Sequence, residues 1–290
     1  MSKRVLITGA NGGFGRLTVE TLLKNGHQVV GSVRGLNGKN KEAAEALIGL
    51  GAHIVEIDVT QNDSVEAGVA QAIERLGGLD VVINNAGVGV IGFQEHFTPE
   101  DFQRLFDVNV FGVQRVNRAA IPTLRAQGDG LLIHISSLLG RMTIPFYGPY
   151  NASKWALEAV AENYRAELSG FGIETCLVEP GGFATDFMGS LMKPSDQSRD
   201  ADYGEMIGAP HQMFESFEGA LASNPAQNPQ NVADAILSVI QGDKGQRPFR
   251  TVVDKMGMGD HLVGYNDMLH QITKGVYSAF HIDGMLEVKS

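Results

Sequence analysis

The sequence predicts an α/β fold built on a doubly wound parallel sheet. Short apolar runs alternate along the chain with stretches of helical spacing, and a cluster of glycines stands where the first run gives way to a helix. Continuous apolar runs are typical of strands buried on both faces, and right-handed crossovers place helices on both sides of such a sheet. No repeat, low-complexity tract or linker divides the chain. We therefore expect one Rossmann-type domain over residues 1–290.

The order of the elements follows from this alternation. Six strand-like runs cover residues 4–8, 28–33, 53–59, 79–84, 130–136 and 172–179. Helical spacing between them covers residues 15–24, 41–50, 63–76, 98–127 and 150–169. Beyond the sixth run we expect a helix over residues 231–240 and a last strand within residues 248–253. The tail from Asp254 shows no clear pattern.

The charge and the cysteine usage exclude several classes of function. The net charge is −10, with no block of like charges, which argues against binding to nucleic acid or to an anionic membrane surface. The single cysteine, Cys176, excludes an intrachain disulfide and a cysteine-based metal site, and no H-E-x-x-H spacing occurs, so we expect no metal. The longest early apolar run is too short to span a membrane, and no signal-peptide pattern opens the chain, so we expect a cytoplasmic protein.

The first glycine cluster predicts a binding site for a dinucleotide. It reads Thr8-Gly9-Ala10-Asn11-Gly12-Gly13-Phe14-Gly15, between a strand and a helix. Glycines in such a turn let the backbone approach a pyrophosphate, and the helix N-terminus supplies free N–H donors. Two spacings fit, T-G-x-x-x-G-x-G and T-G-x-x-G-x-x-G, and the sequence does not choose between them.

The end of the second strand favours NADP over NAD. An acidic residue there would bind the ribose hydroxyl of NAD, but no Asp or Glu occurs from Thr21 to Lys41. Arg34 stands beside the empty place, and Lys39 and Lys41 add positive charge. The planar guanidinium of arginine binds two phosphate oxygens at once, so we expect NADP (as NADPH) and expect Val33→Asp to shift preference toward NAD.

A tyrosine and a lysine form the candidate catalytic pair. Tyr150 and Lys154 share one face of a predicted helix at i, i+4 spacing, so the ammonium is expected to lower the pKa of the phenol toward working pH. A tyrosine tuned in this way can serve as a general acid and base. Residues 84–87 and the pair Ser136 and Ser137 follow the fourth and fifth strands, at the edge of the sheet where ligands bind.

These pieces together resemble the short-chain dehydrogenase/reductase family in its ordinary short form. The matching motifs are Thr8–Gly15, Asp58-Val59, Asn84–Gly87, Asn109, Ser137, Tyr150 with Lys154, and Pro180-Gly181 followed by Thr185, in the family's order over about residues 3–190. The resemblance implies a catalytic tetrad of Asn109, Ser137, Tyr150 and Lys154, with Ser137 preferred to Ser136 because its spacing to Tyr150 is the family's. The resemblance and the glycine cluster together give the expected cofactor contacts: Gly9, Asn11, Gly13, Phe14, Gly15, Arg34, Asp58, Val59, Asn85, Ala86, Gly87, Tyr150, Lys154, Pro180, Gly181 and Thr185.

The expected activity is interconversion of a carbonyl and an alcohol by hydride transfer. Ser137 and Tyr150 would donate hydrogen bonds to the carbonyl oxygen, Tyr150 would deliver the proton, and Asn109 would hold a relay water. Since cells generally keep NADPH reduced, we expect reduction of the carbonyl. Residues 183–228 are rich in Met and Phe, and we expect them to form a lid over an apolar substrate. The family's members commonly form homodimers or homotetramers through helices near residues 98–127 and 150–169. A nucleotide-sugar epimerase or dehydratase using NAD, and a non-catalytic dinucleotide-binding regulator, stay open as alternatives.

Overall fold

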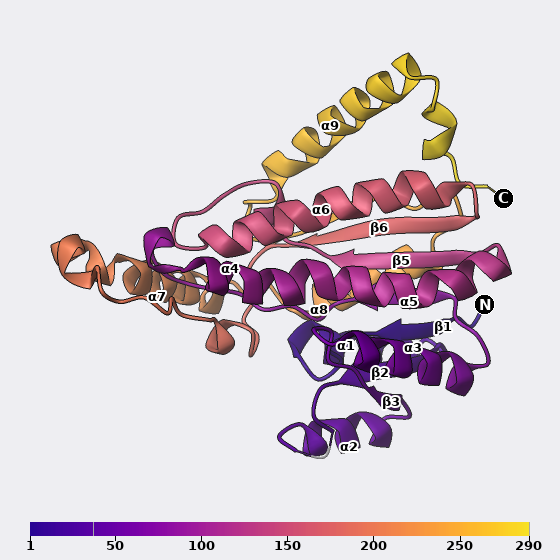
Figure 1. Ribbon diagram of the computed structural model, residues 1–290, viewed down its shortest axis with the longest axis horizontal. Helices are drawn as coiled ribbons and strands as arrows, with labels where there is room; N and C mark the ends of the chain where they lie inside the picture. The colour runs from indigo at the N-terminus through magenta and orange to yellow at the C-terminus, as the bar shows by residue number, and fades with distance from the viewer. Residues whose placement is uncertain (37, 290) are drawn as a thin grey trace.

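Seven parallel strands form one sheet in the order β3-β2-β1-β4-β5-β6-β7 (Figure 1), which confirms the predicted fold class. The computed structural model describes residues 1–36 and 38–289. The strands are β1 (Arg4–Ile7), β2 (Gln28–Val33), β3 (His53–Glu56), β4 (Val81–Asn84), β5 (Gly130–Ile135), β6 (Ile173–Pro180) and β7 (Arg250–Val253). The strand expected within residues 248–253 is therefore present, and it pairs with β6.

Helices cover both faces of the sheet. They are α1 (Gly13–Lys24), α2 (Lys41–Gly49), α3 (Asn62–Leu76), α4 (Pro99–Phe106), α5 (Gly112–Gln127), α6 (Gly148–Ser169), α7 (Ala209–Ala222), α8 (Gln230–Gln241) and α9 (Asp260–Ala279). Alternate strand residues pack to opposite sides, as the pleat requires. Ile7 of β1 faces a core shared with α1, α2 and α8, whereas Leu6 faces a core shared with α3, α5 and the end of α6.

The helix expected over residues 98–127 is interrupted at its centre. Thr98 caps α4 through a reciprocal capping box with Asp101, and α4 passes into a π-helical turn, Asp107–Phe111, before α5 begins. A π turn inserts one extra residue into the helix and is common at functional sites. It changes the direction of the side chains on either side of it, and Asn109 lies within it.

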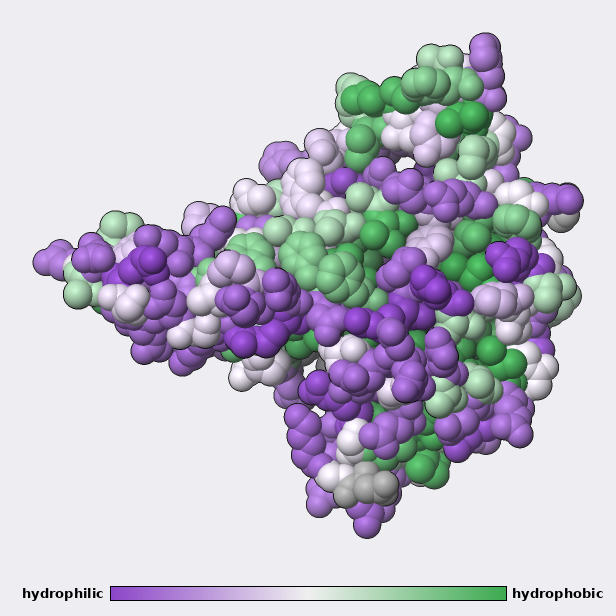
Figure 2. All heavy atoms as spheres, in the orientation of Figure 1, coloured by the Kyte–Doolittle hydropathy of each residue, from purple (hydrophilic) through white to green (hydrophobic). Residues whose placement is uncertain are grey.

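Two segments extend beyond the sheet. The segment that contains α7 projects to the left of the sheet, and α9 stands apart above α6 at the top (Figure 1). Exposed apolar side chains of α9, such as Met268 and Ile272, form the apolar area seen over that helix in Figure 2. Among the residues that the structure describes, none of the helices is both long and apolar enough to traverse a bilayer.

Candidate active site

A cleft of about 940 Å³ opens at the carboxyl edge of the sheet, beside β1 and β4. Connections from these two neighbouring strands leave toward opposite faces, and open α/β sheets bind ligands at such a switch point. All sixteen residues expected to contact the cofactor line this cleft, from Gly9 to Thr185. Ser137, Tyr150 and Lys154 also line it, whereas Asn109 lies buried behind its wall.

The glycine turn fits only one of the two spacings. Gly9 has φ +65°, and a Cβ on Gly15 would lie 2.2 Å from the carbonyl oxygen of Gly9. A Cβ on Gly13 would meet Thr185 at 2.7 Å, while one on Gly12 would meet nothing closer than 3.6 Å. The steric requirement therefore falls on Gly9, Gly13 and Gly15, as in T-G-x-x-x-G-x-G. No side chain caps the first turn of α1, so its N–H groups face the cleft as donors for a pyrophosphate.

The end of β2 presents a positive charge to the cleft. The side chain of Arg34 is 59% exposed, and its guanidinium lies 4.0 Å from Asp58 Oδ2. Lys39 also lines the cleft. Lys41 was expected to add positive charge at this end of the cleft. It instead pairs with Glu45 along α2 at 3.8 Å and does not line the cleft. This end can therefore hold a phosphate between Arg34 and Lys39.

Ser137, Tyr150 and Lys154 converge at the mid-point of the cleft. Ser137 shares a hydrogen bond with Tyr150 that favours the phenolate, but burial raises the pKa of Tyr150 to about 12 in the free protein. The lowered pKa expected from sequence is thus not found, because the Lys154 ammonium lies 5.6 Å from the centre of the phenol ring and donates instead to the Ile135 carbonyl at 2.7 Å. Burial lowers the pKa of Lys154 to about 8.

Asn109 joins the π turn to the loop after β4. Its Oδ1 accepts from Val88 N at 2.9 Å, and its Nδ2 donates to the Val88 carbonyl at 2.9 Å and to Ser153 Oγ at 3.1 Å. Both amide protons are therefore used in holding the wall of the cleft next to α6, while Oδ1 accepts one bond and can accept a second. The relay water expected at Asn109 stays a prediction.

Two buried residues of the sheet, His134 and Cys176, do not line the cleft. His134 is fully buried, and burial together with the Lys154 charge lowers its pKa to about 3, so it stays neutral. Burial raises the pKa of Cys176 to about 12, so its thiol stays protonated. Both match the sequence expectation of core residues. Over residues 1–36 and 38–289, no group of His, Cys, Asp and Glu side chains could hold a metal ion.

The far end of the cleft is apolar, and the sequence predicted only part of it. Phe187, Met188, Leu191, Met213 and Phe217 line it, as expected for residues 183–228, and Tyr147 joins them. Several lining residues come from segments with no sequence signal: Leu139, Met142 and Ile144 after β5, and Met258 from the tail.

Two aromatic side chains of this region, those of Phe146 and Tyr203, pack outside the cleft. Phe146 has φ +71° and packs edge-on against Phe93 at 5.2 Å, outside the cleft. Tyr203 also packs against Phe93, with the ring centroids 4.1 Å apart, whereas Phe183 lines the cleft and packs edge-on against Phe14 at 5.5 Å. Residues 183–228 therefore place some aromatic side chains in the cleft and use others to pack against the rest of the protein.

Comparison with known proteins agrees with this geometry. The family described as short chain dehydrogenase matches residues 3–196. The chain belongs to this family. This short-chain dehydrogenase is 35% identical over 249 residues to the 3-ketodihydrosphingosine reductase of Bacteroides thetaiotaomicron, covering 86% of this chain and 87% of that protein.

Solved structures extend the similarity over the whole fold. A short-chain dehydrogenase from Streptomyces avermitilis superimposes with a TM-score of 0.76 at 29% identity, over 97% of this chain and 98% of that one. The actinorhodin polyketide ketoreductase, solved with NADPH, gives a TM-score of 0.73 at 26% identity, over 89% of this chain and 97% of that one. This chain is accordingly an oxidoreductase of the short-chain dehydrogenase type, in a family that acts on alcohol and carbonyl groups.

Proposed function

We propose that the protein reduces an apolar ketone or aldehyde with NADPH. The convergence of Ser137, Tyr150 and Lys154 in one cleft carries this proposal, because the two hydroxyls can donate to one carbonyl oxygen. The glycine turn and the uncapped start of α1 fit a pyrophosphate, and Arg34 with Lys39 fits a 2′-phosphate. Bound NADPH would supply the hydride.

The chain's own residues supply proton transfer and positioning. Ser137 Oγ is held in place by accepting from Leu139 N at 3.1 Å, and its hydroxyl proton, which is directed at Tyr150 in the free protein, can turn to a substrate oxygen in the cleft. Ser137 and Tyr150 stabilise the charge that grows on the substrate oxygen, and Tyr150 then gives it a proton. With a cofactor bound, Lys154 would hydrogen-bond the nicotinamide ribose, and its ammonium charge would favour the phenolate and so lower the pKa of Tyr150 from its value in the free protein.

An apolar substrate is favoured by the walls beyond Tyr150. Met213 and Phe217 of α7 and Met258 of the tail line the cleft, and no charged residue of α7 or of residues 255–259 lines it. Thioether and phenyl groups suit a flexible hydrocarbon, because methionine adapts to irregular shapes. The relative named 3-ketodihydrosphingosine reductase acts on a ketone by its name, which supports the carbonyl assignment. We propose that residues 183–228 act as the lid over this substrate.

Substitution of Tyr150 tests the function. We expect Tyr150→Phe to abolish NADPH oxidation across a panel of apolar ketones, aldehydes and quinones. The variant should still bind NADPH, measured as a change in NADPH fluorescence on binding. Tyr164→Phe is the matched control, because that hydroxyl bonds Gln114 on α5, away from the cleft. Near-normal turnover in Tyr150→Phe would refute the mechanism. Cofactor binding without turnover of any carbonyl by the native protein would favour the non-catalytic regulator.

We also propose a homodimer or homotetramer formed through α5 and α6. Tyr164 of α6 donates to Gln114 of α5 at 2.6 Å, so the two helices present a joined surface. Phe111 just before α5, Trp155 within α6 and Phe171 just after α6 are 50%, 40% and 47% exposed. Large apolar side chains spread over one helical layer suit a subunit interface.

A further inference from the structure

The loop between β7 and α9, residues 254–259, reaches the cleft. Of these residues, all of which the structure describes, Met258 alone lines it. In the sheet, β7 is the edge strand beside β6, whereas β2, which ends next to Arg34, lies near the opposite edge. Met258 therefore stands at the end of the cleft away from the proposed phosphate site, where the apolar residues of α7 such as Phe217 also line it.

The backbone on both sides of Met258 is held by hydrogen bonds. Asp254 Oδ2 accepts from Gly259 N at 2.9 Å, which closes the loop on itself. Asn224, which follows α7, donates to the Lys255 carbonyl at 2.9 Å. A loop bonded at its first two residues and at its last can present the side chain between them in a defined place.

The side chain of Gln227 joins this loop to the backbone that follows β6. Gln227 lies between α7 and α8 and is 4% exposed. Its Oε1 accepts from Lys255 N at 2.6 Å, and its Nε2 donates to the Gly182 carbonyl at 2.7 Å and to Asp254 Oδ1 at 3.2 Å. One buried carboxamide thus fixes the distance between the loop that carries Met258 and the segment that leaves the catalytic edge of the sheet.

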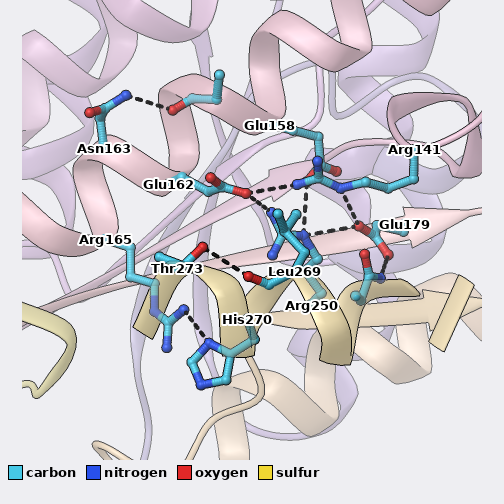
Figure 3. A network of polar contacts seen from close by, with 12 residues as sticks. Arg141, Glu158, Glu162, Asn163, Arg165, Glu179, Arg250, Leu269, His270 and Thr273 are labelled. Carbon is cyan, nitrogen blue, oxygen red and sulfur yellow. Dashed lines mark hydrogen bonds and ion pairs between the residues drawn. The ribbon is translucent and has the colours of Figure 1, made fainter. Parts of the chain in front are cut away.

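The helix that follows the loop is tied to β6 as well (Figure 3). Asn266 of α9 donates to Glu179 Oε2 at 2.7 Å. The Glu179 side chain is 0% exposed and lies 3.3 Å from Arg250, so it is a rigid anchor for the helix. One turn further along α9, His270 lies 3.5 Å from the guanidinium of Arg165 on α6. Both sides of the loop are therefore fixed relative to the strand that ends at the cleft.

We propose that Met258 is a specificity-determining residue that contacts the hydrocarbon part of the ketone, and that Gln227 is the positioning residue that holds it there. A thioether side chain is apolar and adapts to irregular shapes, and burial of an alkyl group against it stabilises a complex in proportion to the buried area. The site therefore favours ketones with long alkyl groups over small ones. This inference rests on the proposed reductase function and narrows its substrate class.

Binding of ketones to the protein loaded with NADP⁺ tests the contact without turnover, because the oxidised cofactor carries no hydride to transfer. We expect Met258→Ala to weaken binding of methyl heptyl ketone about tenfold, equivalent to about two buried methylene groups, and binding of butanone less than about twofold. Titration calorimetry gives both dissociation constants. Met268→Ala is the matched control, because Met268 is 63% exposed on α9 and does not line the cleft.

Substitution of Gln227 by glutamate tests the positioning role. Gln227→Glu keeps the shape of the side chain but removes both hydrogen-bond donors, so a carboxylate faces the Gly182 carbonyl and Asp254. The loop then moves, and binding of methyl heptyl ketone should weaken about as much as in Met258→Ala. The double variant should bind no more weakly than Met258→Ala, because Gln227 acts through Met258, whereas independent structural effects would add.

Gln230→Glu is the matched control for that substitution. Gln230 Nε2 also donates to a carboxylate, that of Asp234 at 2.8 Å, and to the hydroxyl of Thr21 on α1 at 2.8 Å. Gln230 does not line the cleft, so its substitution should leave ketone binding unchanged. Melting temperatures check that each variant is folded at the temperature of the titration, and Met258→Ala decides the contact even if Gln227→Glu does not fold.

The outcomes separate this inference from the proposed function. Unchanged binding of methyl heptyl ketone by Met258→Ala, equal weakening for the two ketones, or additive losses in the double variant would overturn the inference, as would a native protein that binds neither ketone. A native protein that binds methyl heptyl ketone but oxidises no NADPH in its presence would instead refute the reductase function, because the titrations do not depend on turnover.

Discussion

Arg34 is the residue on which the choice of cofactor depends. Its side chain is exposed at the cleft wall, so truncation leaves no buried group unpaired. We expect Arg34→Ala to raise KM for NADPH about tenfold to a hundredfold, the cost of a charge-assisted hydrogen bond, and to change KM for NADH little. Steady-state kinetics with both cofactors measure this. Lys41→Ala is the control, since Lys41 pairs with Glu45 away from the cleft. Better use of NADH than NADPH by the native enzyme would show that this assignment is wrong.

Val33 is a poor position for a substitution meant to shift cofactor preference toward NAD. The sequence places it where an acidic residue would favour NAD, but its side chain is 1% exposed and belongs to the core over α1 and α2. Val33→Asp would bury a carboxylate without a partner, so any change in cofactor preference would be mixed with loss of stability. Sequence position identified the strand end, and only the packing shows which side chain points to the ligand.

Residue types and spacing predicted the site better than they predicted its energetics. Every expected cofactor residue lines one cleft, because the carboxyl ends of parallel strands must meet at one edge. The pKa of Tyr150 was predicted in the wrong direction for the free protein, since spacing gives no measure of burial. The charges of Arg141, Glu179 and Arg250 likewise come together only through the sheet, from segments more than thirty residues apart in sequence.

Close packing around the turn after β5 fixes the position of Ser137. A Cβ on Gly140 would lie 2.8 Å from Ser136 Oγ and 3.0 Å from Glu158 Cγ, and both neighbours are buried. We expect Gly140→Ala to cost about 1–3 kcal/mol of unfolding free energy and to lower kcat, because the turn that holds Ser137 must shift. Urea unfolding and carbonyl reduction measure the two effects.

Gly219 provides the matched control for that turn. It lies within α7, and a Cβ there meets nothing within 4 Å. Alanine favours helix more than glycine does, so Gly219→Ala should leave stability unchanged or raise it by up to about 1 kcal/mol. Equal stability of the Gly140→Ala and native proteins would contradict the steric argument.

Elements with their own periodicity were predicted, and elements that depend on distant contacts were not. β7 and α8 carry local apolar patterns and appeared where expected. The π turn was missed because its residues continue the helical spacing of α4 and α5. The helix α9 was missed because most of its apolar residues are exposed, so its pattern does not mark a core face.

At the scale of the whole molecule, the exposed apolar side chains divide among separate surfaces. Ile48 and Leu50 lie on and after α2, at the opposite edge of the sheet from β7, whereas Phe111 and Phe171 lie at the ends of α5 and α6. Arg125 covers one face of the Phe171 ring at 5.7 Å and leaves 47% of the residue exposed. The α5–α6 surface is thus apolar at its ends and positively charged beside one of them.

Charged substitutions on the α5–α6 surface test the proposed oligomer. A carboxylate buried in a subunit interface without a partner costs several kcal/mol, so Phe111→Asp combined with Phe171→Asp should convert the native oligomer into monomers. Light scattering after size-exclusion chromatography gives the mass, and circular dichroism checks the fold. Ile48→Asp adds a charge at an equally exposed apolar site, 56% exposed, and should leave the mass unchanged. A monomeric native protein would refute the proposed oligomer. Dissociation by Ile48→Asp alone would place the interface elsewhere, because Ile48 does not lie on the surface formed by α5 and α6, which the Tyr164–Gln114 hydrogen bond joins.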